Sequence, residues 1–289
     1  MISPTGGKLA FLFDLDGTLV DSVYQHVLAW REALQEAGVE LAVWRIHRQI
    51  GMSGGLLINA LLRETGHPIT QEEAERLQRL HAEAYARHVN SVRLLPGARE
   101  LLDCLSKMGV PYAIATSGRL ESARHTLQLL TLHPDVPIIT RDQVHHAKPD
   151  PDLFLAAAER LNMPINRCTV VGDSVWDLLA ARRAWALGVG LLSGGYGQQE
   201  LEQAGAYRVY QDPADLLNCP QLWARGYWVE VDHPTTGPLP YPGEPVKMSA
   251  TPWQLRRPAP LLGQHTAEVL AELGIEAEEC ARLRAKGVV

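Results

Sequence analysis

The sequence lacks closely spaced cysteines of the kind that hold zinc or form a redox pair. Its four cysteines lie far apart and mostly in apolar surroundings, at Cys104, Cys168, Cys219 and Cys280. Isolated cysteines in such surroundings are typical of buried thiols in a reducing compartment. We therefore expect reduced, buried thiols and a cytoplasmic location.

Long apolar runs are also missing, and none approaches the length needed to span a bilayer, so we expect no membrane partner. Residues 1–8 show no charged region followed by an apolar region, so we expect no secretory signal there. Nucleic-acid-binding domains are usually basic, whereas this chain has 27 basic and 33 acidic residues and a formal net charge of -6. We therefore expect no nucleic-acid partner. What is present is an ordinary globular composition, 46% hydrophobic and 21% charged, in 289 residues that suffice for one large domain or two smaller ones.

One apolar run, residues 8–13, ends abruptly in two aspartates that are one residue apart, Asp14 and Asp16. Such a run indicates a buried strand, and the acids after it would lie at the rim of an α/β sheet, where ligands bind. Two carboxylates this close repel each other unless a cation neutralises them, and hard oxygen ligands suit Mg²⁺. Gly17 allows a sharp turn behind them. The pattern therefore predicts a magnesium site.

Three stretches of different pattern follow this strand. Residues 22–93 contain helical patterns and read as a small helical insertion. Residues 94–217 alternate between helices and strands, which predicts βα units in a mainly parallel sheet covered on both faces. Prolines gather after residue 218, and residues 234–260 are expected to be extended or turn-like. We expect a module boundary near residue 218.

The individual elements can be predicted from periodicity and end signals. Expected helices are 22–37, 43–50, 56–64, 72–88, 98–108, 121–130, 151–161, 175–186, 198–204, 213–217, 264–273 and 277–286. Expected strands are 8–13, 111–115, 136–140, 168–171, 189–192, 207–210 and 227–231. Ser22 is a possible N-cap of the first helix, which Gly38 ends, and Thr70 with Glu73 forms a capping-box pattern.

Polar residues stand at four places where a strand ends or a helix begins. They are Asp14 with Asp16, Thr116-Ser117-Gly118, Lys148-Pro149, and Gly172-Asp173-Ser174-Val175-Trp176-Asp177. Consecutive strands of a parallel sheet deliver their C-terminal ends to one edge, so all four motifs are expected to converge on one site. Taken singly, they could be turn acids, a surface lysine and a helix-capping acid at Asp177. We interpret His145, His146 and residues 194–197 as loop residues.

In order and spacing, these four motifs resemble those of the haloacid dehalogenase superfamily. The helical insertion resembles the small cap of its phosphoglycolate phosphatase and β-phosphoglucomutase branch. The resemblance covers residues 8–217. It implies an α/β fold with a Rossmann-like three-layer core of parallel strands and a small helical cap inserted after the first strand. The core would comprise residues 1–21 and 94–217, and the cap residues 22–93.

The resemblance also implies a role for each motif residue. Asp14 would be the nucleophile, since a carboxylate can accept a phosphoryl group as an acyl phosphate. Asp16 would be the general acid to the leaving oxygen and then the base for water. Asp173 would complete a Mg²⁺ site with Asp14 and the backbone carbonyl of Asp16. Asp177, on the same helical face, would support the metal shell.

The remaining motif residues would handle the phosphate. Thr116 and the amides after it, at Ser117 and Gly118, would hold phosphate oxygens. Lys148 would neutralise charge on the nucleophile and the transferring group, and phosphoryl transfer needs little more than positioning and charge cancellation. The expected function is Mg²⁺-dependent hydrolysis of a small phosphorylated metabolite, of sugar phosphate or phosphoglycolate type, through an aspartyl-phosphate.

Two other functions stay open. His26 matches a cap histidine of the hexose-phosphate mutases and would contact substrate, although many phosphatases also have one and the residue could instead face solvent. The mutases carry an arginine after a Gly-x-Ser turn where this chain has Gly54, and Arg48 could substitute for it. Asp16 itself favours phosphate chemistry, because a halide leaving group needs no proton. The other alternative is a non-catalytic scaffold that binds a partner.

Residues 218–289 have no counterpart in ordinary members of that superfamily. Residues 226–234, 249–253 and 257–265 resemble the C-terminal end of class III CoA-transferases. This implies a fusion, in which the transferase's catalytic aspartate and most of its CoA-binding part are missing, so CoA transfer is not expected. The tail is expected to bind a protein partner or to self-associate, or else to be a remnant.

Overall fold

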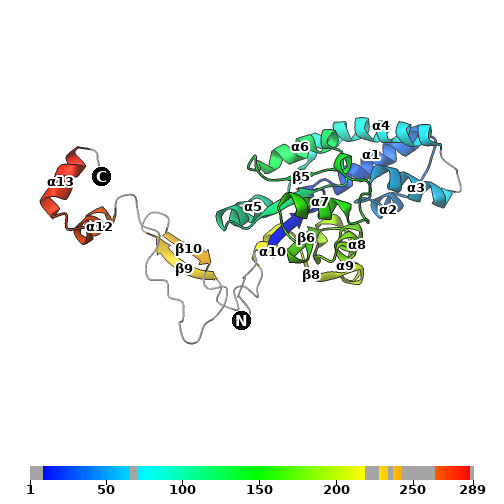
Figure 1. Ribbon diagram of the computed structural model, residues 1–289. Coiled ribbons are helices and arrows are strands. Elements are labelled where there is room, and N and C mark those ends of the chain that lie inside the picture. Colours follow the sequence, from blue (N-terminus) through cyan, green and yellow to red (C-terminus); the bar gives the residue numbers. More distant parts are fainter. Residues whose placement is uncertain (1–8, 66–69, 219–227, 234–236, 243–263, 287–289) are drawn as a thin grey trace. The chain divides into compact units, whose positions relative to one another are not determined.

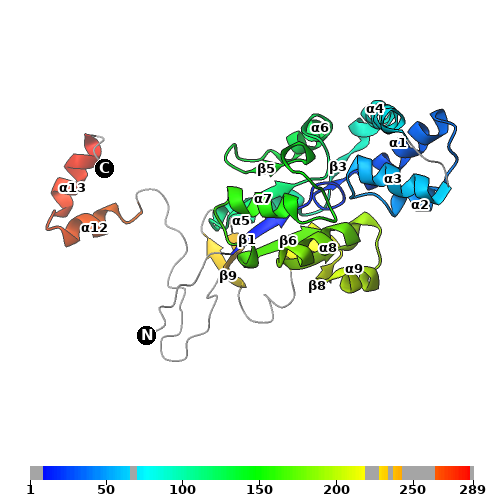
Figure 2. The ribbon, with the colours of Figure 1, turned by 45° about the vertical axis from the view of Figure 1, so that its right-hand side comes forward.

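A computed structural model describes residues 9–65, 70–218, 228–233, 237–242 and 264–286 of the chain. The chain divides into two compact units, Met1–Leu217 and Asn218–Val289. Figures 1 and 2 show the secondary structure of each unit. Among the described residues, no helix is both long enough and apolar enough to cross a membrane.

The first unit is built on a six-stranded parallel sheet with the order β5-β4-β1-β6-β7-β8. Its strands are β1 (Ala10–Phe13), β4 (Tyr112–Ala115), β5 (Ile138–Ile139), β6 (Cys168–Gly172), β7 (Leu187–Leu191) and β8 (Ala206–Tyr210). The chain adds β4 and β5 on one side of β1, and then β6, β7 and β8 on the other. This reversal makes the end of β1 a topological switch point, where open α/β sheets bind their ligands.

Helices flank the sheet on both faces and complete three layers (Figure 2). Phe13 and Ile114 pack with residues of α5 and α6, whereas their neighbours Leu12 and Ala113 pack with residues of α7 and α8. This alternation explains why the strands read as continuous apolar runs, since both faces are buried. The helices are α5 (Ala98–Lys107), α6 (Leu120–Leu130), α7 (Asp152–Arg160), α8 (Val175–Ala184), α9 (Gln198–Ala204) and α10 (Pro213–Leu217).

Four helices form the insertion between β1 and β4, namely α1 (Val23–Glu36), α2 (Val43–His47), α3 (Gly54–Thr65) and α4 (Gln71–His88). They share an apolar centre that includes Trp30, Ile46 and Leu57, and α1 lies along α4 (Figure 1). The expected capping box is confirmed. Thr70 Oγ1 accepts a hydrogen bond from the Glu73 amide at 3.2 Å, and the Glu73 carboxylate accepts one from the Thr70 amide at 2.9 Å.

Most expected elements are present with bounds that differ by a few residues, and two short strands were missed. β2 (Val20–Asp21) and β3 (Arg93–Leu94) pair in antiparallel fashion where the chain enters and leaves the insertion. Two residues are too few to show a period, so no sequence pattern indicates them. The helix expected over 43–50 ends at His47, because the chain turns ahead of Gly51, whose φ is +97°. Single 3₁₀ turns are η1 (Val89–Ser91), η2 (Arg141–Gln143), η3 (Ile165–Arg167) and η4 (Leu192–Gly194).

The second unit contains a hairpin and two helices. β9 (Trp228–His233) pairs in antiparallel fashion with β10 (Gly237–Pro242), and α12 (Thr266–Glu272) and α13 (Ala277–Ala285) follow. The strand and both helices expected here are present, and β10 is an addition within the extended stretch. Its three prolines are two residues apart, so their missing N–H groups share one edge and the other edge is free to pair. The rest of 234–260 lies outside the described residues.

Three of the four cysteines lie in the described part of the chain, and all three are free thiols. Cys168 and Cys280 are buried, as expected. Cys104 is only half-buried, so that expectation was wrong for this residue. It lies on α5 beside Met108, at a helix edge that the sheet does not cover completely. Cys219 lies outside the described residues.

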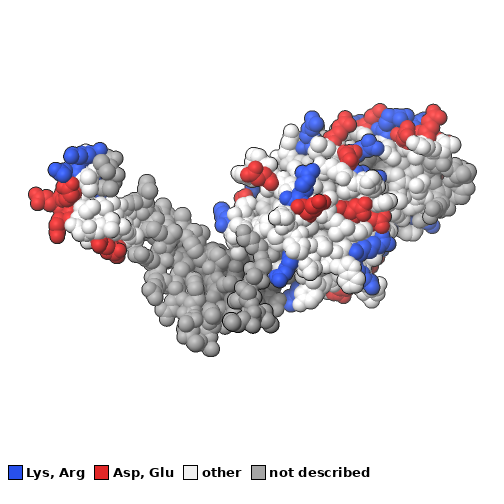
Figure 3. Space-filling model, viewed as in Figure 1, with Lys and Arg blue, Asp and Glu red and all other residues white. Residues whose placement is uncertain are grey.

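Charged side chains of both signs are interspersed on the face of the first unit that Figure 3 shows. Some of the first unit's charges form exposed pairs, such as Arg87 with Glu32 and Arg183 with Asp150. Exposed pairs of this kind contribute about 0–1 kcal/mol each. The described residues of this face therefore present no extended field of one sign.

Candidate active site

The polar motifs meet at the switch point of the sheet. Asp14 directly follows β1, and its amide continues the ladder by donating to the Val171 carbonyl of β6 at 2.9 Å. The amide of Thr116, one residue after β4, donates in the same way to the Ile139 carbonyl at 3.0 Å. Asp173 follows β6. Three adjacent strands thus bring their polar ends to one edge, as the spacing predicted.

A cavity of about 1140 Å³ opens at this edge, between the sheet and the helical insertion. Its lining includes Asp14, Asp16, His26 and the turn 116–118, together with residues of α3 and α4. Lys148, Asp173 and Asp177 are buried and do not line it. The predicted residues therefore form two groups, one that faces the cavity and one buried group that contacts Asp14 and its neighbours.

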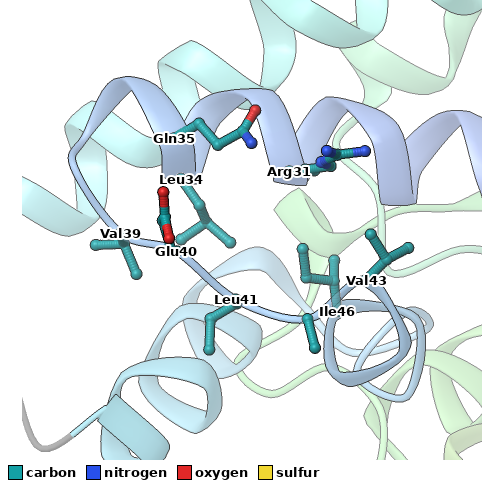
Figure 4. Close-up of a pocket in the computed structure, with 9 residues that line it drawn as sticks. Arg31, Leu34, Gln35, Val39, Glu40, Leu41, Val43 and Ile46 are labelled. Carbon is teal, nitrogen blue, oxygen red and sulfur yellow. The ribbon is translucent and has the colours of Figure 1, made fainter.

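A second cavity, of about 530 Å³, lies within the insertion (Figure 4). Arg31 and Gln35 reach it from α1, and Leu41, Val43 and Ile46 supply apolar surface. None of the predicted site residues lines it. The chemistry suggested by the sequence belongs to the larger cavity.

Lys148 is the buried cation of the site, with 0% of its side chain exposed. Its Nζ contacts the Asp14 carboxylate, lies 2.8 Å from Asp177 Oδ1 and donates to the Ala115 carbonyl at 2.9 Å. Burial lowers the pKa of Lys148, but the two carboxylates outweigh burial and the pKa is raised overall. The ammonium form is therefore held in place, and a surface role for this lysine is excluded.

Three buried carboxylates gather here, and two of them, Asp14 and Asp177, pair with Lys148. Oxygen atoms of Asp14, Asp173 and Asp177 lie within 4.8 Å of one another. Burial raises the pKa of Asp14 to about 7 against the effect of Lys148, and Asp177 and Asp16 raise it further. Burial, together with the charges of Asp177 and Asp14, also raises the pKa of Asp173 well above its ordinary value. Hard oxygen donors with uncompensated negative charge are a set that fits a divalent cation.

Two glycines shape this cluster. Gly17 has a φ of +85°, and a Cβ there would lie 2.4 Å from Asp173 Oδ2. A Cβ on Gly172 would lie 2.3 Å from the Cβ of Asp177. Both glycines are therefore required by close approach, and the sharp turn predicted at Gly17 is present. Thr18, for which no role was predicted, donates from its hydroxyl to Asp173 Oδ1 at 2.9 Å.

Asp177 contacts both its own helix and the lysine. Its Oδ2 accepts hydrogen bonds from the Ser174 amide at 3.1 Å and from the Ser174 hydroxyl at 2.5 Å. The Asp177 amide donates in turn to Ser174 Oγ at 3.4 Å, which completes a capping box on α8. The other oxygen of Asp177 lies beside Lys148. The two readings of this residue, as a helix cap and as support for the acidic cluster, are thus compatible in one geometry.

Asp16 is held by groups from the insertion. Ser22 Oγ donates to Asp16 Oδ1 at 2.6 Å, and His26 Nε2 lies 3.4 Å from the same oxygen. Burial raises the pKa of Asp16, but His26 and Ser22 outweigh burial and the pKa lies below its usual value. Ser22 occupies the N-cap position of α1, as expected, but its side chain makes no capping hydrogen bond, and its hydroxyl donates to Asp16 instead.

His26 does not face solvent. Its Nδ1 lies 3.2 Å from Nε2 of His81, and its ring stacks on Tyr85 with 4.0 Å between ring centroids. Trp30 stacks on the other imidazole at 4.2 Å. Sequence reasoning missed His81 and Tyr85. They are four residues apart on α4 and hence share one helix face, which was the available signal.

The turn after β4 offers polar groups to the cavity. Thr116 is buried, and its Oγ1 accepts a hydrogen bond from the Gly118 amide at 3.0 Å. The Ser117 hydroxyl is buried and has no hydrogen-bond partner among the described residues. A buried hydroxyl of this kind is available to an oxygen-rich ligand.

Arg48 cannot replace the missing mutase arginine. Its guanidinium pairs with the Glu200 carboxylate of α9 and lies over the Tyr196 ring, 4.4 Å from the centroid. Arg48 does not line the cavity. The interpretation of this residue as a substitute is therefore wrong, because its charge is already used between the insertion and the core. His145 and His146 are exposed loop residues, as expected.

Comparison with known proteins supports this geometry. A sequence model of the family described as haloacid dehalogenase-like hydrolase matches residues 9–184, and one of CoA-transferase family III matches residues 198–266. The second match confirms the resemblance of the tail.

Similar proteins include phosphatases, a hydrolase and the β-phosphoglucomutase of Bacillus subtilis, which is 28% identical over 72% of this chain and 91% of the relative. Hexitol phosphatase A of Escherichia coli (strain K12) is 34% identical over 60% of this chain and 78% of the relative. Phosphoglycolate phosphatase of Caulobacter vibrioides is 32% identical over 71% of this chain and 87% of the relative. A crystal structure of a hydrolase from Pseudomonas syringae shares 56% identity with a TM-score of 0.71, and covers 74% of this chain and 98% of that one. With the first family match spanning more than half of the sequence, the chain belongs to the haloacid dehalogenase-like hydrolases.

Proposed function

We propose that the chain is a Mg²⁺-dependent phosphatase that hydrolyses a small phosphorylated metabolite, of sugar phosphate or phosphoglycolate type, through an aspartyl-phosphate. The observation that carries the proposal is Asp14. This carboxylate lines the cavity at the switch point, contacts the buried Lys148 and lies within the cluster of acids. The phosphatase relatives support the reaction class.

In the first half-reaction, an oxygen of Asp14 attacks phosphorus, and the bond from phosphorus to the substrate's ester oxygen breaks. Asp16, which also lines the cavity, gives a proton to that leaving oxygen. Because His26 and Ser22 hold the pKa of Asp16 below its usual value in the free protein, Asp16 must take up this proton before the ester bond breaks. Lys148 keeps its charge next to Asp14 throughout.

In the second half-reaction, water attacks phosphorus, and the bond from phosphorus to Asp14 breaks. Asp16 now takes the proton from the attacking water and so returns to the protonated form that donates in the next turnover. The Ser117 hydroxyl, which has no other partner among the described residues, and the Ser117 amide hold phosphate oxygens in this proposal, while Thr116 fixes the turn by accepting a hydrogen bond from the Gly118 amide. The helical insertion acts as a cap that limits water in the cavity and selects the substrate.

The residues that would hold Mg²⁺ are Asp14, Asp173 and the backbone carbonyl of Asp16, with Asp177 behind them. When bound, the ion supplies positive charge against the carboxylates and the transferring phosphoryl group. The close approach of Gly17 to Asp173 and the hydrogen bond from Thr18 support this assignment, since they orient the carboxylate.

The nearest alternative is a hexose-phosphate mutase of the same branch. Gly54 in place of an arginine, and the engagement of Arg48 with Glu200, both speak against it. Incubation with a hexose 1-phosphate and its bisphosphate separates the two functions: we expect phosphate release, whereas isomer formation without net release would favour the mutase. Silence across a panel of small phosphate esters would favour the non-catalytic scaffold.

Removal of divalent metal by EDTA is expected to abolish phosphate release, and added Mg²⁺ to restore it. Apparent Mg²⁺ affinity should rise with pH and level off above pH about 7, because below that pH Asp14 holds a proton that the ion must displace. Calorimetric titration on both sides of pH 7, in two buffers of different ionisation enthalpy, measures affinity and proton release together. Equal affinity at both pH values without proton release would contradict the acidic cluster as the metal site.

We also propose that residues 1–21 with 94–217 form the hydrolase core, 22–93 the cap and 218–289 an accessory segment. A chain that ends at Leu217 is expected to fold with Tm within about 4 °C of the full chain and to keep its activity. The solved relative supports this, since 98% of it aligns with 74% of this chain. Loss of folding would show that the tail is needed by the core. Light scattering on both chains tests self-association through 218–289.

A further inference from the structure

The end of α2 touches the core through one buried histidine. His47, the last residue of α2, has 9% of its surface exposed, and its Nε2 lies 2.8 Å from the carbonyl oxygen of Gly194. A carbonyl only accepts, so Nε2 must carry the hydrogen in this contact. The ring also stacks on Tyr24, with 5.4 Å between centroids, and packs beside Tyr196 at 5.7 Å. The imidazole is therefore fixed in orientation as well as in place.

Gly194, which accepts this hydrogen bond, lies directly against an acid of the proposed metal site. A Cβ built on Gly194 would be 1.8 Å from Asp173 Oδ2, and one built on Gly17 would be 2.4 Å from the same atom. The other oxygen of Asp173 accepts from Thr18. Backbone on two sides and a hydroxyl on the third thus determine how this carboxylate is turned.

The η4 turn that contains Gly194 has a second attachment. Ser193 Oγ donates to the Gly17 carbonyl at 2.6 Å, which ties the turn to the loop that follows β1. From the insertion, His47 holds the neighbouring carbonyl. A displacement of His47 would let the turn move away from Asp173 and free the carboxylate to rotate.

Other contacts join the same end of the insertion to the core without touching this turn. Tyr196 Oη and Trp176 Nε1 donate to the Arg48 carbonyl at 2.8 and 3.2 Å, and the Arg48 guanidinium pairs with Glu200. They attach the insertion as His47 does, but they do not reach Asp173. A variant that removes one of these contacts therefore shows the effect of loosening the insertion without a direct effect on the turn at Gly194.

We propose that His47 is a positioning residue for the metal site: its N–H holds the Gly194 turn against Asp173 and so keeps that carboxylate in the orientation that binds Mg²⁺. The inference rests on the proposed Mg²⁺-dependent phosphatase. If the contact between His47 and Gly194 strengthens Mg²⁺ binding, then Mg²⁺ binding strengthens that contact equally, since coupling between two sites is reciprocal. Loss of a residue that orients a metal ligand typically weakens metal binding by about 10-fold to 100-fold.

The test is calorimetric titration of Mg²⁺ into the full chain without substrate. His47→Phe keeps a stacking ring but has no N–H, and is expected to weaken Mg²⁺ binding by about 10-fold. His47→Gln places an amide N–H near the position of Nε2 and should restore affinity close to that of the unaltered chain. Arg48→Gln, which removes the Glu200 pair, should leave affinity unchanged. Phosphate release by His47→Phe should recover at high Mg²⁺, which a general packing defect would not allow.

Equal affinity in His47→Phe and the unaltered chain would overturn the inference, and so would an equal loss in Arg48→Gln. If His47→Phe does not fold, His47→Asn, whose shorter amide does not span to the carbonyl, takes its place. The outcomes also separate this inference from the function on which it rests. Absence of Mg²⁺ binding or phosphate release in the unaltered chain would refute the proposed function, whereas normal binding in every His47 variant would refute only the role of His47.

Discussion

Asp14→Asn is expected to lower kcat for phosphate release by more than about 10³-fold. The amide has nearly the shape of the carboxylate but lacks the charge and nucleophilicity needed to form an acyl phosphate. It also removes one of the three carboxylates whose oxygen atoms lie within 4.8 Å of one another, so Mg²⁺ should bind more weakly as well. Phosphate release measured at saturating Mg²⁺ separates the two effects, since only the metal defect can be overcome by concentration.

The loss must not come from unfolding, and the electrostatics offer a direct check. Burial raises the pKa of Asp14 from 3.8 to about 7, so folding loses stability as pH rises through this interval, and the loss is complete above pH about 7. The metal-free asparagine variant should therefore be at least as stable as the unaltered chain at alkaline pH. Asp135→Asn, a change at an exposed acid, serves as the control and should alter neither property. Normal turnover by Asp14→Asn would remove Asp14 as the nucleophile.

The parts of the fold that could be predicted are those with a repeating pattern or a strong end signal. The strand before Asp14 was recognisable because its apolar run is followed directly by two closely spaced acids. The capping box of α4 was recognisable because Thr70 and Glu73 have the required spacing. Such signals are local in sequence, and burial on both faces of the sheet reinforces them.

What the sequence could not show are contacts made across the fold. Ser22 occupies the N-cap position, where a side-chain oxygen usually accepts from a backbone amide, yet its hydroxyl makes no such bond and donates to the charged carboxylate of Asp16. His47 and Gly194 are 147 residues apart, and no periodicity connects them. Arg48 was considered as a substitute for the mutase arginine because it is close in sequence to the turn at Gly51. Its partner Glu200 is 152 residues away and could be found only in the fold.

The junction with the tail shows a similar difference between sequence and structure. The CoA-transferase family match covers residues 198–266 and so begins before the boundary between the two units. Residues 206–210 nevertheless form β8, which pairs in parallel with β7 and completes the sheet of the first unit. If the CoA-transferase-like sequence begins near residue 198, we infer that it supplies β8, an edge strand that pairs with β7 of the hydrolase sheet.

Lys148→Met is expected to destabilise the metal-free protein by about 3–5 kcal/mol near neutral pH. Methionine fills much of the same space, so the cost is electrostatic. Among the described residues, Lys148 is the only cation that forms an ion pair with Asp14 or Asp177, and both carboxylates lose it. Removing one partner of a buried pair leaves uncompensated charge, which costs more than the pair itself contributes. Activity should fall as well, since the charge on Asp14 and on the transferring group is no longer balanced.

The pH dependence of this defect distinguishes it from a packing error. The pKa of Asp14 is already raised to about 7 with the lysine present, and removal of the cation raises it further. A carboxyl whose folded pKa exceeds its unfolded value costs stability as pH rises through the interval between them, so the deficit of Lys148→Met should shrink on acidification. Denaturant unfolding at several pH values, with Lys107→Met as the exposed control, measures this slope. A deficit that is the same at acid and neutral pH would mean that Lys148 is held for its packing, and that the cation is not what stabilises the acidic cluster.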